Sequence, residues 1–367
     1  MPKAIIVGGG IAGLASGIAF ANVGWDVMVL EQAIRIESMG AALSLWPNAC
    51  AAMSSIGILD AVSATAAPIQ TMLLAAQSGE AILTRAIPGP AFISTRTALQ
   101  NALLVALGDE RLRLNCKVDH ITAGRVVLAS GETLACDLLI DAGGIRAPSE
   151  LGPPPRYSGY GGVLALSDSV AGPCLDGLAA EYWGRDERFG VFELPDNRRY
   201  WFYMRTQPAE APMPSLAACT AAAEGWPPSV AQTIAATPQG ALIPFAVHAK
   251  PPPKTLCTSG VIRVGDAAHA MEPNLGQGAC QGLEDAAALQ AIIAAVPAHS
   301  VGFHYDRLRL KRARMFVRES AQARFGAHGP GAVQFLMRAA LKAIPTAISE
   351  PWMQAMQTMP DYVSSVR

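Results

Sequence analysis

Residues 4–31 decide the fold of this chain, and they read AIIVGGGIAGLASGIAFANVGWDVMVLE. The continuous apolar run at 4–7 is typical of a parallel β-strand that is buried on both faces. A helical segment follows to about Val23, and Gly24 provides its stop. A second strand covers 25–30 and ends at Glu31. The stretch therefore predicts a strand–helix–strand unit of a parallel sheet.

The turn between the first strand and the helix has the spacing G-x-G-x-x-G, at Gly8, Gly10 and Gly13. The first glycine permits a tight turn, the second lets a pyrophosphate approach the backbone, and the third lets the helix pack closely on the strand. The N–H groups at the helix start suit the phosphate charge. Glu31 lies 18 residues after Gly13, near the spacing of an acid that holds ribose hydroxyls. This unit predicts a dinucleotide site, and by itself it does not distinguish NAD from FAD.

Composition limits the class of protein. The chain has 367 residues, of which 51% are hydrophobic and 16% are charged, whereas about 25% charged residues are usual. This length predicts about two domains and a large core. The formal net charge of −1 argues against a nucleic-acid-binding protein, and the apolar content argues against disorder.

The cysteines and histidines show no ligand or disulfide spacing. The seven cysteines are scattered, odd in number and without a C-x-x-C pair, which argues against a disulfide framework or a zinc site. The scattered histidines give no reason to expect a metal either. We see neither a signal peptide nor an apolar run of about 20 residues. We therefore expect a cytoplasmic protein with no transmembrane segment.

The remaining chain alternates between strand and helix patterns. A loop followed by an Ala-rich helix is predicted over 40–49. A helix starts at Arg96, another follows the loop 272–278 to about Ala295, and a third covers 303–325. The predicted strands are 112–118, 126–128, 133–134, 137–140, 188–194, 198–205 and 261–264.

Three motifs together resemble the class A flavoprotein monooxygenases, which share the fold of p-hydroxybenzoate hydroxylase. They are the glycine turn with Glu31, the sequence Gly265-Asp266-Ala267-Ala268-His269, and Pro273-x-x-Gly276-Gln277-Gly278. The resemblance covers nearly the whole chain in the right order. The versions at 40–48 and 273–280 are most similar to the branch of zeaxanthin epoxidase and FAD-dependent urate hydroxylase.

The resemblance implies an α/β fold. A Rossmann-like FAD-binding domain of the glutathione reductase type would be interleaved with a mixed β-sheet substrate domain and followed by C-terminal helices. The implied parts are 1–70, 96–155 and 258–296 for FAD binding, 71–95 and 156–257 for the substrate domain, and 297–367 for the C-terminal helical region.

The resemblance also implies the residues that bind FAD. Asp266 would follow a strand and accept hydrogen bonds from ribitol hydroxyls, although the same position suits a helix N-cap. The segment 276–279 precedes a helix, whose positive end would favour negative charge on the reduced flavin. The implied cofactor contacts are Gly8, Gly10, Ala12, Gly13, Glu31, Gln32, Ser44, Arg96, Val118, Asp266, Gly276, Gln277, Gly278 and Ala279.

Four residues are implied at the reacting edge and in the substrate pocket. Pro273 and Asn274 would lie beside the flavin, and Arg188 and Tyr200 match positions that contact substrate in the urate-oxidising relatives. A guanidinium suits an anionic or carbonyl-bearing ring, and a tyrosine stacks or donates. The alternative for this pair is a surface arginine and a core tyrosine.

The implied activity is an FAD-dependent monooxygenase. NAD(P)H would reduce the flavin, and one atom of O₂ would pass through a flavin C4a-hydroperoxide to an aromatic, heteroaromatic or olefinic small molecule. The protein would be a monomer or a homodimer.

One position departs from the family. Gly143 stands where the family usually has an Asp that helps to organise the NAD(P)H approach. Either Asp141, displaced by two positions, partly substitutes for that acid, or the use of NAD(P)H is weakened or lost. The alternatives are therefore an isomerase, cyclase or oxidase on the same fold, or a flavin-binding protein without turnover.

Overall fold

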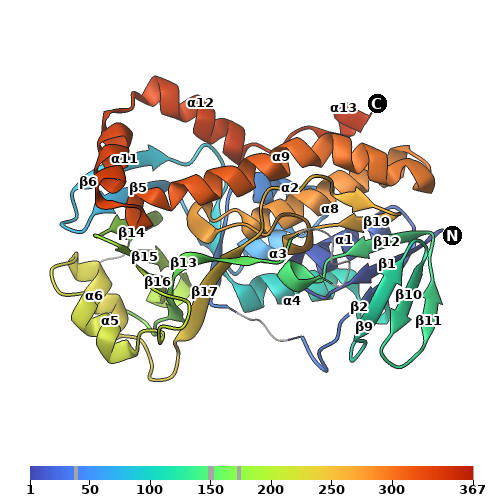
Figure 1. Cartoon of the computed structure of the whole chain (residues 1–367), viewed down its shortest axis with the longest axis horizontal. Coiled ribbons are helices and arrows are strands. Elements are labelled where there is room, and N and C mark those ends of the chain that lie inside the picture. Colours follow the sequence, from blue (N-terminus) through green and yellow to red (C-terminus); the bar gives the residue numbers. More distant parts are fainter. Residues whose placement is uncertain (37–39, 148–152, 172–174, 367) are drawn as a thin grey trace.

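The computed structural model describes residues 1–36, 40–147, 153–171 and 175–366. Two large sheets lie side by side, and the long helix α9 runs across both of them (Figure 1). Each sheet draws its strands from alternating stretches of the chain. The mixed α/β class expected from the sequence is confirmed, whereas the predicted domain limits stay a prediction.

The first sheet is built around β1, whose side chains Ile5 and Ile6 are wholly buried. Its strand order is β18-β19-β12-β1-β2-β8, and all neighbours are parallel except β18 and β19. The strands are β1 Lys3–Val7, β2 Asp26–Leu30, β8 Leu112–Arg113, β12 Leu138–Asp141, β18 Cys257–Thr258 and β19 Val261–Arg263.

Helices cover one face of this sheet and a three-stranded sheet packs on the other. The alternating side chains of β1 show the division, because Ile6 joins the helical core and Ile5 joins the core under the small sheet. The helices are α1 Ile11–Asn22, α4 Arg96–Leu107 and α8 Gly278–Ala295, and the small sheet consists of β9 Val118–Thr122, β10 Arg125–Leu128 and β11 Thr133–Ala135.

The second sheet has seven strands in the order β17-β13-β16-β15-β14-β5-β6, with only β14 and β5 parallel. Helices α5 (Leu216–Ala222) and α6 (Pro228–Ala235) pack on one face, over Phe189 and Trp201. The strands are β5 Thr71–Ala76, β6 Ala81–Ala86, β13 Arg156–Leu166, β14 Leu178–Trp183, β15 Glu187–Glu193, β16 Arg199–Thr206 and β17 Ile243–Ala249.

The remaining elements, among them the long helix α9, connect the sheets and close the chain. A second three-stranded sheet has β7 between β3 and β4. Their bounds are β3 Ala42–Leu45, β4 Ala67–Pro68, β7 Phe92–Thr95, α2 Pro47–Ser55, α3 Leu59–Ser63, α7 Asp266–His269, α9 Val301–Ala323, α10 Phe325–His328, α11 Gly331–Ala343, α12 Thr346–Gln357 and α13 Tyr362–Val366, with 3₁₀ turns η1 Asp109–Arg111, η2 Gly144–Arg146, η3 Pro195–Asn197, η4 Pro273–Leu275 and η5 Ala298–Ser300.

Two local expectations are wrong. The predicted strand 112–118 is broken after β8, because Asn115 has a left-handed φ of 54° that a strand does not tolerate. The predicted loop before the Ala-rich helix contains β3, which pairs with β7. The lengths of β8 and β3 both depend on pairing with strands that are distant in the sequence, β2 and β7.

The structure can be compared with the expectations about cysteines and membrane segments for the described residues. Six cysteines there are free thiols, and Cys174 lies outside the described residues. Within the same part of the chain, none of the helices has the length and apolar character needed to cross a membrane.

A charged cluster lies wholly inside the protein between α8 and α9. Arg309 donates from Nε to Asp285 Oδ1 and from Nη1 to Glu284 Oε2, both at 2.9 Å. Tyr362 of α13 donates to the same Glu284 at 2.9 Å. Burial alone would raise the pKa of Asp285, but His269 and Arg309 outweigh it and lower this pKa to about 2.

We expect Arg309→Met to destabilise the protein by about 3–5 kcal/mol, because two buried carboxylates would lose the cation that they share, and Glu284 would keep only Arg312 and Asp285 only His269. The matched control is Arg307→Met on the same helix, where the arginine is exposed and donates to Ser365 O at 3.1 Å. Urea denaturation followed by tryptophan fluorescence measures the difference. Equal stability of the two variants would contradict a structural role for the cluster.

Acid should weaken the same cluster. The pKa of Asp285 is lower in the folded protein than its ordinary value of 3.8, so its contribution to stability is complete above about pH 4 and is lost as the pH falls toward 2. Urea midpoints measured between pH 5 and pH 2.5 should fall less steeply in Asp285→Asn than in the unmodified protein.

Candidate active site

The glycine turn is packed too tightly for side chains at two positions. A Cβ at Gly8, where φ is 110°, would lie 2.4 Å from Ala142 O, and one at Gly13 would lie 1.9 Å from Gly8 O. Beside Gly10, in contrast, no atom would lie within 4 Å. Gly10 is also the N-cap of α1 and provides no side-chain cap. The turn thus leaves open space at an uncapped helix N-terminus, which suits a phosphate group.

Glu31 is held against this turn. Its Oε2 accepts a hydrogen bond from Gly9 N at 2.7 Å, and its Oε1 accepts one from Ala33 N at 2.9 Å. Gln32 beside it is exposed. Val118 is half-buried at the start of β9, so its backbone lies on the small-sheet side of β2.

Arg96 and Asp266 come together from distant parts of the chain. Arg96 opens α4, and its Nη1 would lie 3.1 Å from a Cβ placed on Gly40. Burial lowers the pKa of Arg96, while the nearby Asp266 and Tyr200 act in the opposite direction. Asp266 is exposed at the start of α7. Gly265 before it has a φ of 58° and donates its N–H to Asp285 at 2.9 Å.

The segment 273–279 forms a tight loop ahead of α8. Gly276 is left-handed, and Gln277 is a buried N-cap whose Oε1 accepts from Asn48 Nδ2 at 2.9 Å. A Cβ on Gly278 would meet no atom within 4 Å. Ala279 is half-buried in the first turn of α8. The loop therefore exposes a second uncapped helix N-terminus.

Trp46 and Ser44 border this loop. The Nε1 atom of Trp46 is buried and has no hydrogen-bond partner among the described residues. It would lie 3.0 Å from a Cβ on Gly276. The Ser44 carbonyl accepts from Cys280 Sγ at 3.4 Å. A buried donor without an acceptor indicates a place for a polar group that is not part of the chain.

Arg188 lies at the junction of the seven-stranded sheet and this loop. Its side chain is 3% exposed, and Nη1 forms an ion pair with Glu181 at 2.9 Å. Nη2 donates to Asn274 Oδ1 at 2.6 Å. Tyr160 also donates to Asn274 Oδ1, at 2.9 Å. The Arg188 guanidinium lies 5.7 Å from the Tyr160 ring centroid and 5.4 Å from that of Phe202.

Tyr200 connects the two groups of residues. It stacks on Phe192 with ring centroids 5.5 Å apart. Burial raises the pKa of its hydroxyl, and the nearby Arg188 and Arg96 oppose that rise. The hydroxyl therefore lies within electrostatic reach of an arginine on each side. Pro273 opens the 3₁₀ turn that carries Asn274.

Sequence reasoning missed the partners of Arg188. Glu181 lies on the neighbouring strand β14, and Tyr160 lies two strands away on β13. Glu272 adds a buried carboxylate that accepts from Tyr160 and pairs with Arg324 at 2.9 Å. The alternation of side chains along each strand predicts which face of the sheet Glu181 and Tyr160 lie on. Their contacts with Arg188 also depend on the pairing register of the strands.

Asp141 does not take the place of an exposed acid at Gly143. It is wholly buried, and its Oδ1 accepts from Gly143 N at 2.9 Å. Its carboxylate therefore holds the loop from inside the protein.

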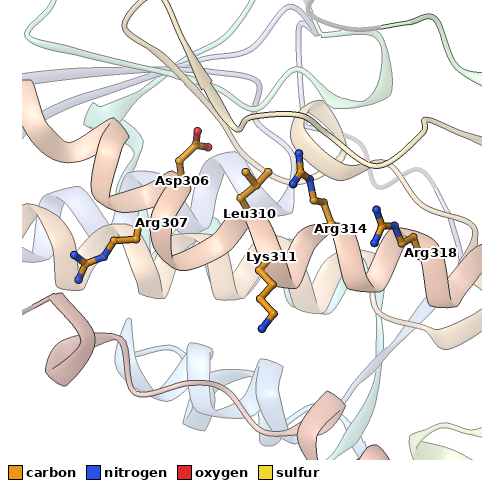
Figure 2. Close-up of a pocket in the computed structure, with 6 residues that line it drawn as sticks. All are labelled: Asp306, Arg307, Leu310, Lys311, Arg314 and Arg318. Atoms are coloured by element: carbon orange, nitrogen blue, oxygen red, sulfur yellow. The ribbon is translucent and has the colours of Figure 1, made fainter.

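A separate groove of about 410 Å³ lies along α9 (Figure 2). None of the predicted site residues lines it. Arg314 is tied there to the backbone carbonyls of Pro253 and Lys254. Its lining residues, which project from successive turns of the helix, are Asp306, Arg307, Leu310, Lys311, Arg314 and Arg318.

Comparison with known proteins gives consistent matches. The family described as "FAD binding domain" matches residues 2–320. The aurachin C monooxygenase/isomerase of Stigmatella aurantiaca is 33% identical over 334 residues, which cover 85% of this chain and 86% of that protein. The FAD-dependent urate hydroxylase of Mycolicibacterium vanbaalenii is 29% identical over 343 residues, 85% of each chain.

A solved structure has the same fold. Klebsiella pneumoniae HpxO, complexed with FAD and uric acid, superposes with a TM-score of 0.86 at 24% identity, covering 99% of this chain and 97% of that one.

The two helix-turn glycines differ in a way that can be tested. We expect Gly10→Ala to fold normally but to retain at least tenfold less FAD, because its methyl group enters the open space beside α1. Gly13→Ala should lose folding stability as well, because its Cβ meets Gly8 O. Circular dichroism reports the fold, and flavin absorbance of the purified protein reports FAD. Normal FAD content in Gly10→Ala would exclude this space as a cofactor site.

Proposed function

We propose that NAD(P)H is the reductant of the flavin in this protein. The chain belongs to the FAD-binding domain family, and its relatives identify it as an FAD-dependent monooxygenase. In this proposal it inserts one oxygen atom from O₂ into an aromatic, heteroaromatic or olefinic small molecule. The proposal is supported mainly by the hydrogen bond from Arg188 to Asn274. This bond links the aromatic face of the seven-stranded sheet to the loop before α8.

The residues present fit FAD. The open space at Gly10, the second uncapped helix start at Gly278 and the unpartnered Trp46 Nε1 are all features that a bound dinucleotide would use. When bound, FAD supplies electron transfer from the nicotinamide and activation of O₂.

Specific chain groups would hold the cofactor. The N–H groups beside Gly10 would face the diphosphate, and Asp266 would accept hydrogen bonds from the ribitol. The start of α8 would favour negative charge at one end of the reduced ring. Arg96 would approach the cofactor from α4. Each of these roles is a proposal for the residues that the sequence singled out.

The substrate would lie between the loop and the sheet. Arg188 and Asn274 would orient the ring, and Tyr200 and Phe202 would border it with aromatic surface. Such a face excludes water from the reacting edge. The relatives' names, which concern urate and aurachin C, support a heteroaromatic substrate.

A second candidate follows from Gly143. Without the family Asp, and with Asp141 turned inward, the approach of NAD(P)H could be lost while FAD remains. The enzyme would then be a flavin-dependent isomerase, cyclase or oxidase. The double name of the Stigmatella relative, monooxygenase/isomerase, is compatible with this candidate.

The visible spectrum separates the two candidates. Under anaerobic conditions we expect NADPH or NADH to bleach the flavin bands, and we expect ¹⁸O₂ to label the product once a substrate is found. Gly143 has a φ of −70°, which other residues tolerate, so Gly143→Asp is the matched variant and should bleach faster. Bands that persist in both proteins, with candidate substrates present, would favour the second candidate.

A further inference from the structure

The charges around Arg188 are already balanced. Glu181 pairs with Arg188 at 2.9 Å, and Glu272 pairs with Arg324 at 2.9 Å. Trp183 Nε1 also donates to Glu181, at 2.6 Å, and so fixes its carboxylate. His328, stacked on Tyr160 at 4.2 Å, adds no charge, because burial and the neighbouring Arg188 lower its pKa to about 2.

An anionic ring would therefore meet no unpaired positive charge at Arg188 or Arg324, and the further arginine near Tyr200, Arg96, lies close to the carboxylate of Asp266. Bringing a negative charge into a buried cluster of zero net charge carries a desolvation cost without a new ion pair. A neutral ring does not incur that cost. The half-buried Phe202, whose ring centroid lies 5.4 Å from the guanidinium, provides apolar surface for such a ring.

One donor in the cluster is still without an acceptor. Arg188 Nε is buried and has no hydrogen-bond partner among the described residues, whereas Nη1 and Nη2 are bound to Glu181 and Asn274. A buried donor of this kind favours a ligand that brings an acceptor. A ring carbonyl brings one without bringing charge.

We propose that Glu181 determines specificity by neutralising Arg188, so that the site takes a neutral, carbonyl-bearing aromatic or heteroaromatic ring and rejects an anionic one. This inference rests on the proposed function, because it places the substrate at Arg188. It narrows the substrate class to neutral rings and assigns a role in specificity to Glu181 of β14.

The first test uses the unmodified holoenzyme and two rings of similar size. 2-Methyl-4(1H)-quinolone is neutral, and 4(1H)-quinolone-2-carboxylate is an anion at pH 7. Binding is measured by perturbation of the oxidised flavin spectrum. We expect the neutral ring to bind at least tenfold more tightly. Tighter or equal binding of the carboxylate would overturn the proposal, and so would the absence of any perturbation by either ring at millimolar concentration.

The second test removes the neutralising charge. In Glu181→Gln the preference for the neutral ring should fall at least tenfold, because Arg188 would be left with a free positive charge. The control is Glu187→Gln, on the other face of the sheet, where the carboxylate accepts from Tyr203 at 2.6 Å. The double variant E181Q/R188Q should lose any affinity gained for the carboxylate. A Glu181→Gln preference equal to that of Glu187→Gln would overturn the proposal.

Both tests use oxidised enzyme without a nicotinamide nucleotide, and the first needs no variant. A failure of NAD(P)H to bleach the flavin therefore counts against the proposed function alone. A wrong ring preference in an enzyme that NADPH does bleach counts against the role of Glu181 alone.

Discussion

The buried salt bridge between Arg309 and the adjacent carboxylates of α8 is the constraint on which the site geometry depends. Asp285 accepts the N–H of Gly265 and so fixes the turn that presents Asp266. Glu284 accepts from Asn48, whose amide also binds Gln277 at the start of α8. Arg309, which contacts both carboxylates, thus links two loops that approach the proposed cofactor position from different directions. Because an unpaired buried charge is so costly, these loops have little freedom to move separately.

The second constraint is the register of the seven-stranded sheet. Arg188 and Phe202 face the dinucleotide-binding side only because β15 and β16 pair as they do. A shift of either strand by one residue would turn its own side chain, Arg188 or Phe202, toward α5 and α6. Gly190 contributes to the same face, since a Cβ there would lie 2.2 Å from the Phe202 ring. The aromatic surface is therefore a product of pairing as much as of composition.

Local patterns predicted the parts of the molecule that depend on local geometry. The turn at Gly8–Gly13 could be identified because its glycines serve steric needs that lie within the unit itself. The hairpin of β15 and β16 could likewise be predicted from the alternation of apolar and polar residues. What could not be predicted was partner choice. Glu284 and Asp285 look like ordinary solvated helix charges until Arg309, 25 and 24 residues later, is brought against them. Likewise, Arg188 alone is compatible with an anionic or a carbonyl-bearing ring, and its pairing with Glu181 could not be predicted from the sequence.

The contact of Tyr362 with Glu284 has a consequence for synthesis of the chain. Asn48 precedes Glu284 by 236 residues, and Tyr362 follows it by 78. At about 5–20 residues per second, the hydroxyl that completes this cluster leaves the ribosome on the order of tens of seconds after the first loop it supports. The nascent protein therefore carries the buried charge of Glu284 without this hydroxyl while the 78 residues up to Tyr362 are added. Cofactor loading before release would have to occur on loops that are not yet locked.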